Sequence, residues 1–215
     1  GSLMVFSPLI EGGTTQLPVL IIRLILLLGL GGWLLVGLCR STLSIPRTGL
    51  WWPIAALLGW SGFSLMWSPY TSVSLQWFLS LLLYAVFFLM ILLTADRERR
   101  VQGFLFLILL MGIFEGGLGI IQYLWSGESR AKGTFFNPNF FSTYETVSAL
   151  LAMSLLWFGG EYGKLGKPFL IVTATISGTA VILAQSRGGA AAFLVALTAV
   201  GYFRYGKSTL FLLLI

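Results

Sequence analysis

The sequence predicts an all-α fold, a polytopic bundle of transmembrane helices with about seven to eight spans. Apolar residues make up 57% of the chain and charged residues 9%, whereas charged residues form about 25% of an ordinary soluble domain. Long apolar runs alternate with short polar segments that contain Gly, Pro and charged residues. Helices satisfy their own backbone hydrogen bonds in lipid, so these runs are expected to be helical.

We expect seven complete spans and the start of an eighth, because each apolar run is bounded by Gly, Pro or charged residues. The spans are predicted at about 17–39, 51–67, 75–94, 101–125, 143–160, 168–184 and 189–203, with the eighth starting near 208. The chain begins Gly1-Ser2 and ends in an apolar run shorter than the roughly 20 residues that cross a bilayer. We therefore expect residues 1–215 to be the N-terminal portion of a single, longer transmembrane domain.

Basic residues divide unevenly between the two sides of this layout. One side carries Arg40, Arg47, Arg97, Arg99, Arg100, Lys164, Lys167, Arg204 and Lys207. The other side carries Arg130, Lys132 and Arg187, and Arg23 lies within the first span. Cytoplasmic loops accumulate Lys and Arg, so the richer side is predicted to be cytoplasmic. The same rule attributes the net charge of +6 to topology rather than to nucleic-acid binding.

Composition excludes several kinds of site within these residues. The chain has one cysteine and no histidine, so a disulfide framework, a zinc site and a histidine-dependent triad cannot be built from it. We expect no metal and no cofactor. Chemistry in this chain would depend on Arg, Lys, Glu, Asn and Tyr side chains.

Arg130, Lys132 and Arg187 are the loop cations on the outer side, where topology gives no reason for them. An anion at the outer surface would explain them, because a guanidinium can bond two phosphate oxygens at once. Arg130 and Lys132 are also compatible with a solvated loop that touches anionic lipid. Arg187 lies in "AQSRGG" between apolar spans, so we expect it to be buried and to have a partner, either a ligand or an internal glutamate.

Four further polar residues are candidates. Glu115 lies mid-span and is expected to face the bundle interior, among glycines that serve either tight packing or a cavity beside a ligand. Glu145 follows the outer loop and is expected to cap the next helix or to orient an arginine. Asn137 and Asn139 flank Pro138 in a rigid turn, with simple turn chemistry as the alternative.

Four segments together resemble the bacterial O-antigen ligase and O-antigen polymerase superfamily. "SLMWSPYTSVSLQ" is similar to that family's Trp-Ser-Pro outer turn, and "GIIQYLWSG" to its helix ending in Gln. "RAKGTFFNPNFFSTY" is similar to its Arg-x-x-Gly-Thr-Phe-x-Asn-Pro-Asn signature, and "LAQSRGGAAAFLVAL" to its Ser-Arg-Gly helix start. These segments fall in this order across most of residues 5–203.

The resemblance implies a membrane glycosyltransferase whose bundle resembles the GT-C class. Such an enzyme transfers a glycan, with inversion and without a metal, from a polyprenyl-diphosphate carrier to lipid A core, a polysaccharide or a protein hydroxyl. The transfer takes place at the periplasmic face of the bacterial inner membrane. Arg130 and Arg187 would be the catalytic residues that stabilise the departing diphosphate. The candidate substrate-binding residues are Lys132, Asn137, Asn139, Glu145 and Glu115.

One departure from the family concerns the general base. Ligases of this family use a histidine in a large outer loop, and this chain has none. We expect that loop and the later spans to lie beyond residue 215, and this portion alone to be inactive. Two other functions remain open at this stage: a transporter or flippase of a lipid-linked sugar, and a structural membrane component in which Arg187 pairs with Glu115.

Overall fold

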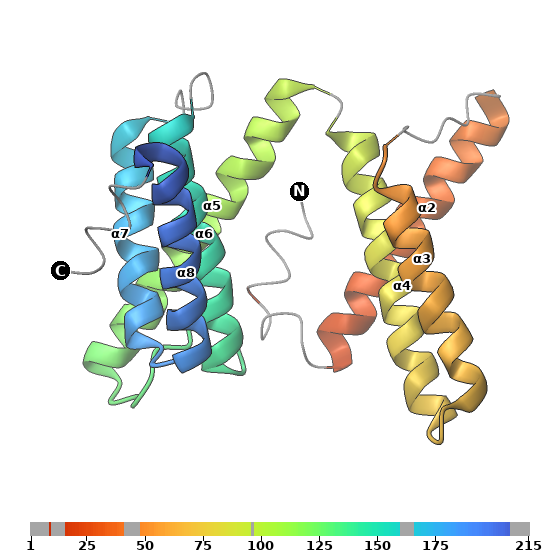
Figure 1. The fold of residues 1–215 in the computed structure, drawn as a ribbon, viewed down its shortest axis with the longest axis horizontal. Helices are drawn as coiled ribbons and strands as arrows, with labels where there is room; N and C mark the ends of the chain where they lie inside the picture. The colour runs from red at the N-terminus through yellow and green to blue at the C-terminus, as the bar shows by residue number, and fades with distance from the viewer. Residues whose placement is uncertain (1–8, 10–15, 41–47, 96, 160–165, 207–215) are drawn as a thin grey trace. The chain divides into compact units, whose positions relative to one another are not determined.

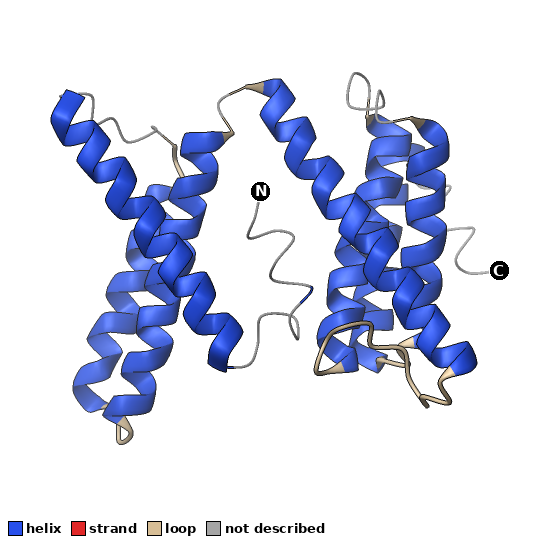
Figure 2. Ribbon diagram, turned by 180° about the vertical axis from the view of Figure 1, so that it is seen from behind, coloured by secondary structure: helices blue, strands red, loops and turns tan. Residues whose placement is uncertain are grey.

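The computed structural model describes residue 9 and residues 16–40, 48–95, 97–159 and 166–206, and this part of the chain is helical without strands (Figures 1 and 2). The all-α prediction is confirmed. The elements are α2 (Gln16–Arg40), α3 (Trp51–Ser64), the 3-10 turn η1 (Leu65–Trp67), α4 (Thr71–Thr94), α5 (Glu98–Trp125), α6 (Pro138–Phe158), α7 (Lys167–Leu183) and α8 (Arg187–Tyr205).

Four of these helices, α2, α4, α5 and α8, are long and apolar enough to cross a membrane. Helix α7 is also apolar but has 17 residues. These properties indicate a helical membrane protein, whereas the number of seven to eight spans stays a prediction. The eighth span, predicted from about 208, lies outside the described residues.

Helix α6 starts five residues earlier than the predicted boundary at 143. It begins at Pro138, with Asn137 as its N-cap. Proline suits the first turn of a helix because its fixed φ is helical and its missing N–H would have no partner there. The Asn-Pro-Asn segment is therefore the beginning of the helix rather than a turn before it.

The described chain forms two compact units, of which one contains residues 20–101. In this unit α3 and α4 are antiparallel: Trp51 at the start of α3 meets Phe88 near the end of α4, with 5.8 Å between ring centroids. Arg23 on α2 donates from Nη2 to Ser80 Oγ on α4, at 2.9 Å. Arg23, which lies within the first predicted span, is thus tied to a neighbouring helix.

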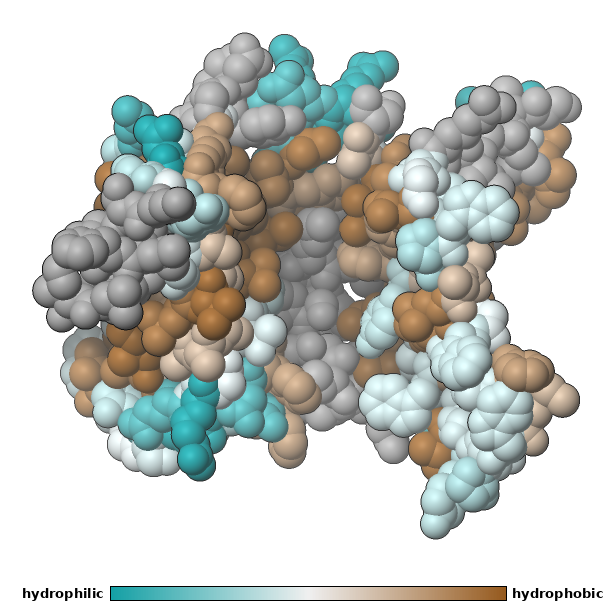
Figure 3. Space-filling view, in the orientation of Figure 1, coloured by the Kyte–Doolittle hydropathy of each residue, from teal (hydrophilic) through white to brown (hydrophobic). Residues whose placement is uncertain are grey.

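The other unit contains, among the described residues, 102–159 and 166–206, and so includes α5 from residue 102 onward together with α6, α7 and α8. Consecutive helices α6, α7 and α8 are antiparallel, with α6 packing against both α7 and α8 (Figure 1). Two buried apolar clusters lie in this unit, one around Phe141 and one around Leu109 and Leu170. In the space-filling view of this unit, apolar residues occupy the middle and hydrophilic residues gather toward the two ends (Figure 3).

A face of small residues on α5 lets α6 and α7 approach closely. A Cβ added at Gly112 would lie 2.6 Å from Ser148 Oγ, and one at Gly119 would lie 2.6 Å from Phe141 Cζ. Small residues at this spacing share one helix face and are common where membrane helices pack. Of the two uses considered for these glycines, the contacts favour packing.

Gly112→Ala should destabilise the fold, whereas Gly117→Ala should not. Ala at 112 overlaps Ser148, and overpacking of this kind costs about 1–3 kcal/mol. A Cβ at Gly117 meets nothing within 4 Å, so the helix propensity of Ala should add up to about 1 kcal/mol there. Thermal unfolding of the two variants in the same detergent checks the pair. A common shift in both variants would contradict the packing role of Gly112.

Candidate anion-binding site

The connection between α7 and α8 fixes the first residue of α8. Gln185 has φ of +48°, the left-handed conformation that ends a helix. Ser186 is the N-cap of α8, and its Oγ accepts a hydrogen bond from Gly189 N at 3.2 Å. Serine is a preferred N-cap because its hydroxyl satisfies an otherwise free N–H of the first turn. Arg187 is consequently the first residue of α8.

The loop between α5 and α6 folds back against this connection. Ala131 N donates to Leu183 O at 3.0 Å, and Gln122 Nε2 donates to Gly133 O at 2.9 Å. Ala131 and Phe135 are buried and pack against the Phe141 cluster. Figure 2 shows this loop in tan across the ends of the α6–α8 helices. Its backbone and apolar side chains therefore hold it at the C-terminal end of α7.

Glu115 anchors the same loop from α5. Its Oε2 accepts from Thr134 N at 2.9 Å and its Oε1 from Thr134 Oγ1 at 2.8 Å. Gly133 has φ of +58°, and a Cβ there would lie 2.5 Å from Glu115 Oε2. Glu115 is fully buried, as expected for a residue facing the bundle interior. The Arg187–Glu115 pair of the structural alternative is not found among the described residues, where Glu115 bonds Thr134.

Arg130 is held by two acceptors. Its Nε donates to Ala184 O at 2.8 Å, and its Nη2 donates to Asn139 Oδ1 at 2.9 Å. The first acceptor lies at the C-terminal end of α7, where the helix dipole favours a cation. A guanidinium has five N–H donors, so these two bonds orient the side chain and leave donors available for a ligand.

A cavity of about 480 Å³ lies beside Arg130, at the N-terminal ends of α6 and α8. The residues that line it are Arg130, Asn139, Thr143, Gln185, Ser186, Arg187, Gly188 and Gly189. These described lining residues include two arginines and no carboxylate. The positive end of the α8 dipole adds to the same field. The cavity is thus electropositive and rich in hydrogen-bond donors, which suits an anion.

Arg187 is exposed, contrary to the expectation that it would be buried. Within the described part of the chain its side chain makes no hydrogen bond or ion pair. The reason is its position as the first residue of α8, where the side chain leaves the helix end instead of entering the packed interface. Its guanidinium is therefore available to a ligand in the cavity.

Lys132 and Asn137 lie outside the cavity lining. Lys132 Nζ pairs with Glu128 Oε1 at 2.8 Å within the loop, and both side chains are partly exposed. Asn137 Oδ1 accepts from Asn139 N at 2.8 Å, which makes it the cap of α6. The charge of Lys132 is thus neutralised by Glu128. Asn137 has a structural role, as the cap of α6, and does not line the cavity as a substrate-binding residue would.

Asn137→Ala should cost about 1 kcal/mol of stability, because it removes the cap of α6. Asn137→Asp keeps an acceptor for Asn139 N and should remain close to the wild type. Chemical unfolding of the purified full-length variants measures the difference. Equal destabilisation by Ala and Asp would show that the side-chain oxygen is not what stabilises this helix start.

Glu145 does not cap α6, so that prediction is wrong. It lies two turns inside the helix, fully buried, because α6 starts at Pro138 instead of near 143. Its Oε2 faces α5, where a Cβ on Gly116 would be 3.1 Å away. In the described residues it makes no ion pair with an arginine.

Sequence reasoning missed two residues that line the cavity, Thr143 and Gln185. It also missed Ala184, whose carbonyl oxygen accepts from Arg130. Thr143 follows Asn139 by four residues, so a helix starting at Pro138 would have placed both on one face. Gln185 and Ala184 gave no signal, because their roles come from backbone geometry at the end of α7.

No protein-family model, curated protein or solved structure matches this chain. The O-antigen ligase resemblance therefore rests on the four sequence segments.

Proposed function

We propose that this chain belongs to an enzyme that transfers a glycan from a polyprenyl-diphosphate carrier to an acceptor hydroxyl. The transfer takes place at the periplasmic face of a bacterial inner membrane, and the acceptor belongs to lipid A core, a polysaccharide or a protein. One observation carries the proposal. Arg130 and Arg187, far apart in sequence, line the same cavity without a carboxylate among its described lining residues.

The chemistry requires stabilisation of a leaving diphosphate. The acceptor oxygen attacks the anomeric carbon, the bond from that carbon to the phosphate oxygen breaks, and its electron pair leaves with the diphosphate. Negative charge grows on the diphosphate as the transition state is reached, so preorganised cations lower the barrier. Two guanidinium groups provide the positive charge that stabilises the diphosphate, without a metal ion.

The two arginines suit different parts of this task. Arg130 is already oriented by Ala184 O and Asn139 Oδ1, so it resembles a preorganised donor that costs little reorganisation. Arg187 is exposed and has no such restraint, so it can close onto a bound phosphate. Gly188, which also lines the cavity, is exposed and has no atom near its missing side chain, so a ligand can approach the backbone of α8 there.

The acceptor proton needs a general base within hydrogen-bond reach. The resemblance implies that a histidine in a large outer loop supplies this base, and this chain contains no histidine. The helical membrane bundle, of GT-C type in this proposal, would supply the diphosphate site.

The test is glycan transfer from a polyprenyl-diphosphate donor by the full-length protein in membranes. Arg130→Ala and Arg187→Ala are compared with wild type at matched expression levels. Undiminished transfer in both variants would remove the site assignment. Loss of folding in both would favour the structural alternative, and glycan movement across the membrane without transfer would favour a flippase.

A further inference from the structure

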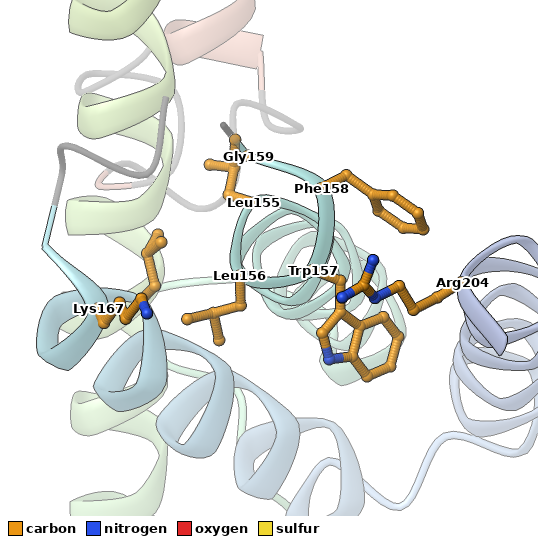
Figure 4. A pocket seen from close by; sticks show the side chains of 8 residues that line it. Leu155, Leu156, Trp157, Phe158, Gly159, Lys167 and Arg204 are labelled. Atoms are coloured by element: carbon orange, nitrogen blue, oxygen red, sulfur yellow. The ribbon is translucent and has the colours of Figure 1, made fainter. Parts of the chain in front are cut away.

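A second cavity lies at the opposite end of the α6–α8 helices. These helices are consecutive and antiparallel, so the C-terminal ends of α6 and α8 and the start of α7 meet at that end. The cavity has a volume of about 390 Å³ (Figure 4). Its lining residues are Leu155, Leu156, Trp157, Phe158, Gly159, Lys167, Leu170 and Arg204.

Two cations from different helices line this cavity. Lys167 is the first residue of α7, and Arg204 lies in the last turn of α8. Both are exposed, and neither has a carboxylate partner among the described residues. The N-cap of α7 is Gly166, which has no side chain to cap the helix, so the positive end of the α7 dipole adds to the two charges.

Aromatic residues hold the Arg204 side of the cavity. The Arg204 guanidinium lies 5.9 Å from the centroid of the Tyr205 ring, and that ring packs edge-on against Trp157 at 5.8 Å. Figure 4 shows Arg204 extending from α8 toward Trp157 on α6. Rings of Trp and Tyr prefer the headgroup level of a bilayer, where an apolar body meets a polar environment. Aromatic residues beside the two cations are thus typical of the headgroup level, where lipid phosphates lie.

The remaining wall is hydrocarbon. Phe158 lines the cavity with an exposed ring, and Leu155 and Leu156 line it with partly buried side chains. A free anion in water gains no binding free energy from apolar side chains. A phosphate attached to acyl chains gains binding free energy both from the cations and from the apolar side chains. Basic pockets between membrane helices on the cytoplasmic side are suited to anionic headgroups for this reason.

We propose that this cavity binds the phosphate of an anionic phospholipid. The site is separate from the Arg130–Arg187 cavity and does not depend on glycan transfer. By the distribution of Lys and Arg it lies on the side predicted to be cytoplasmic. Lys167 and Arg204 neutralise the phosphate from two helices, and Trp157 and Tyr205 position Arg204. Phe158, Leu155 and Leu156 contact the start of the acyl chains.

The experiment titrates phosphatidylglycerol into the full-length protein in detergent and measures bound lipid by native mass spectrometry. Phosphatidylcholine is the zwitterionic comparison. We expect Lys167→Gln and Arg204→Gln each to weaken phosphatidylglycerol binding about fivefold, with a larger loss in the double variant. Arg97→Gln/Arg99→Gln removes two exposed charges elsewhere in the chain and should leave binding unchanged. Arg204→Lys keeps the positive charge and should retain most of the phosphatidylglycerol binding.

Three results would overturn the proposal. The first is equal phosphatidylglycerol binding by wild type and the Lys167→Gln/Arg204→Gln variant. The second is competition by inorganic phosphate at concentrations similar to the lipid, which would assign the site to a free anion. The third, which does not need any variant to fold, is a wild-type protein that shows no preference for phosphatidylglycerol over phosphatidylcholine.

Discussion

Arg130→Ala and Arg187→Ala should each lower glycan transfer by the full-length protein about a hundredfold or more. Each removes one guanidinium from the cavity that both residues line. Losing a single hydrogen-bond donor to a developing anion typically costs roughly 10²–10³ in rate. Initial rates of transfer, measured at saturating acceptor and matched protein level, give the comparison. Size-exclusion profiles of the variants show whether the fold is retained.

Lysine substitutions separate charge from geometry at the two positions. Arg130 uses Nε and Nη2 for two different acceptors, and a lysine ammonium cannot reproduce that planar fork. Arg130→Lys should therefore lose nearly as much activity as Arg130→Ala. Arg187 has no such bonds in the described chain, so Arg187→Lys should keep more. Full activity in both lysine variants would contradict an oriented role for Arg130.

Lys132→Ala measures how much of the loss of glycan transfer comes from removing a positive charge from the loop, wherever that charge lies. Lys132 already pairs with Glu128 at 2.8 Å and does not line the cavity. We expect a loss well below that of either arginine. A loss equal to that of Arg130→Ala would mean that the outer loop acts through its total charge, and the cavity geometry would no longer explain the site.

The convergence of Arg130 and Arg187 could be predicted from sequence because charge distribution is a global signal. Positive residues on the sparsely charged side of a membrane protein need a local reason, and this singled out both residues together with Lys132. The all-helical fold could also be predicted from sequence, because an apolar run of about 20 residues in lipid satisfies its backbone hydrogen bonds by forming a helix. The Ser-Arg-Gly start of α8 also carried its own cap, Ser186.

The hydrogen-bond partners of the site residues could not be predicted from the sequence. Thr134 reaches Glu115 only because Gly133 takes a left-handed conformation and the loop folds back onto α5. Arg130 is held by the carbonyl of Ala184, and no side-chain pattern signals a backbone acceptor. The Glu145 prediction failed because the helix boundary was placed too late, and Pro138 at a first-turn position was the available signal.

Glu115→Ala should unfold the loop between α5 and α6 and abolish transfer, whereas Glu115→Gln should preserve both the fold and the activity. Ala removes the two Glu115 oxygens that accept from Thr134, and each lost hydrogen bond costs about 0.5–1.5 kcal/mol. Gln keeps two bonds, because its amide oxygen can accept from Thr134 N and its amide nitrogen can donate to Thr134 Oγ1. Limited proteolysis within 126–137 and unfolding midpoints in detergent measure the difference.

The same pair of variants distinguishes the enzyme from a transporter. A transporter that moves its substrate by charging or neutralising a carboxylate inside the membrane would lose activity with Gln, which cannot carry charge. An enzyme in which Glu115 only anchors Thr134 would keep activity with Gln and lose it with Ala. Retained folding but abolished transfer in Glu115→Gln would contradict the anchoring role and give Glu115 a direct part in the chemistry. That outcome would move the functional centre from the α7–α8 connection into the interior of α5.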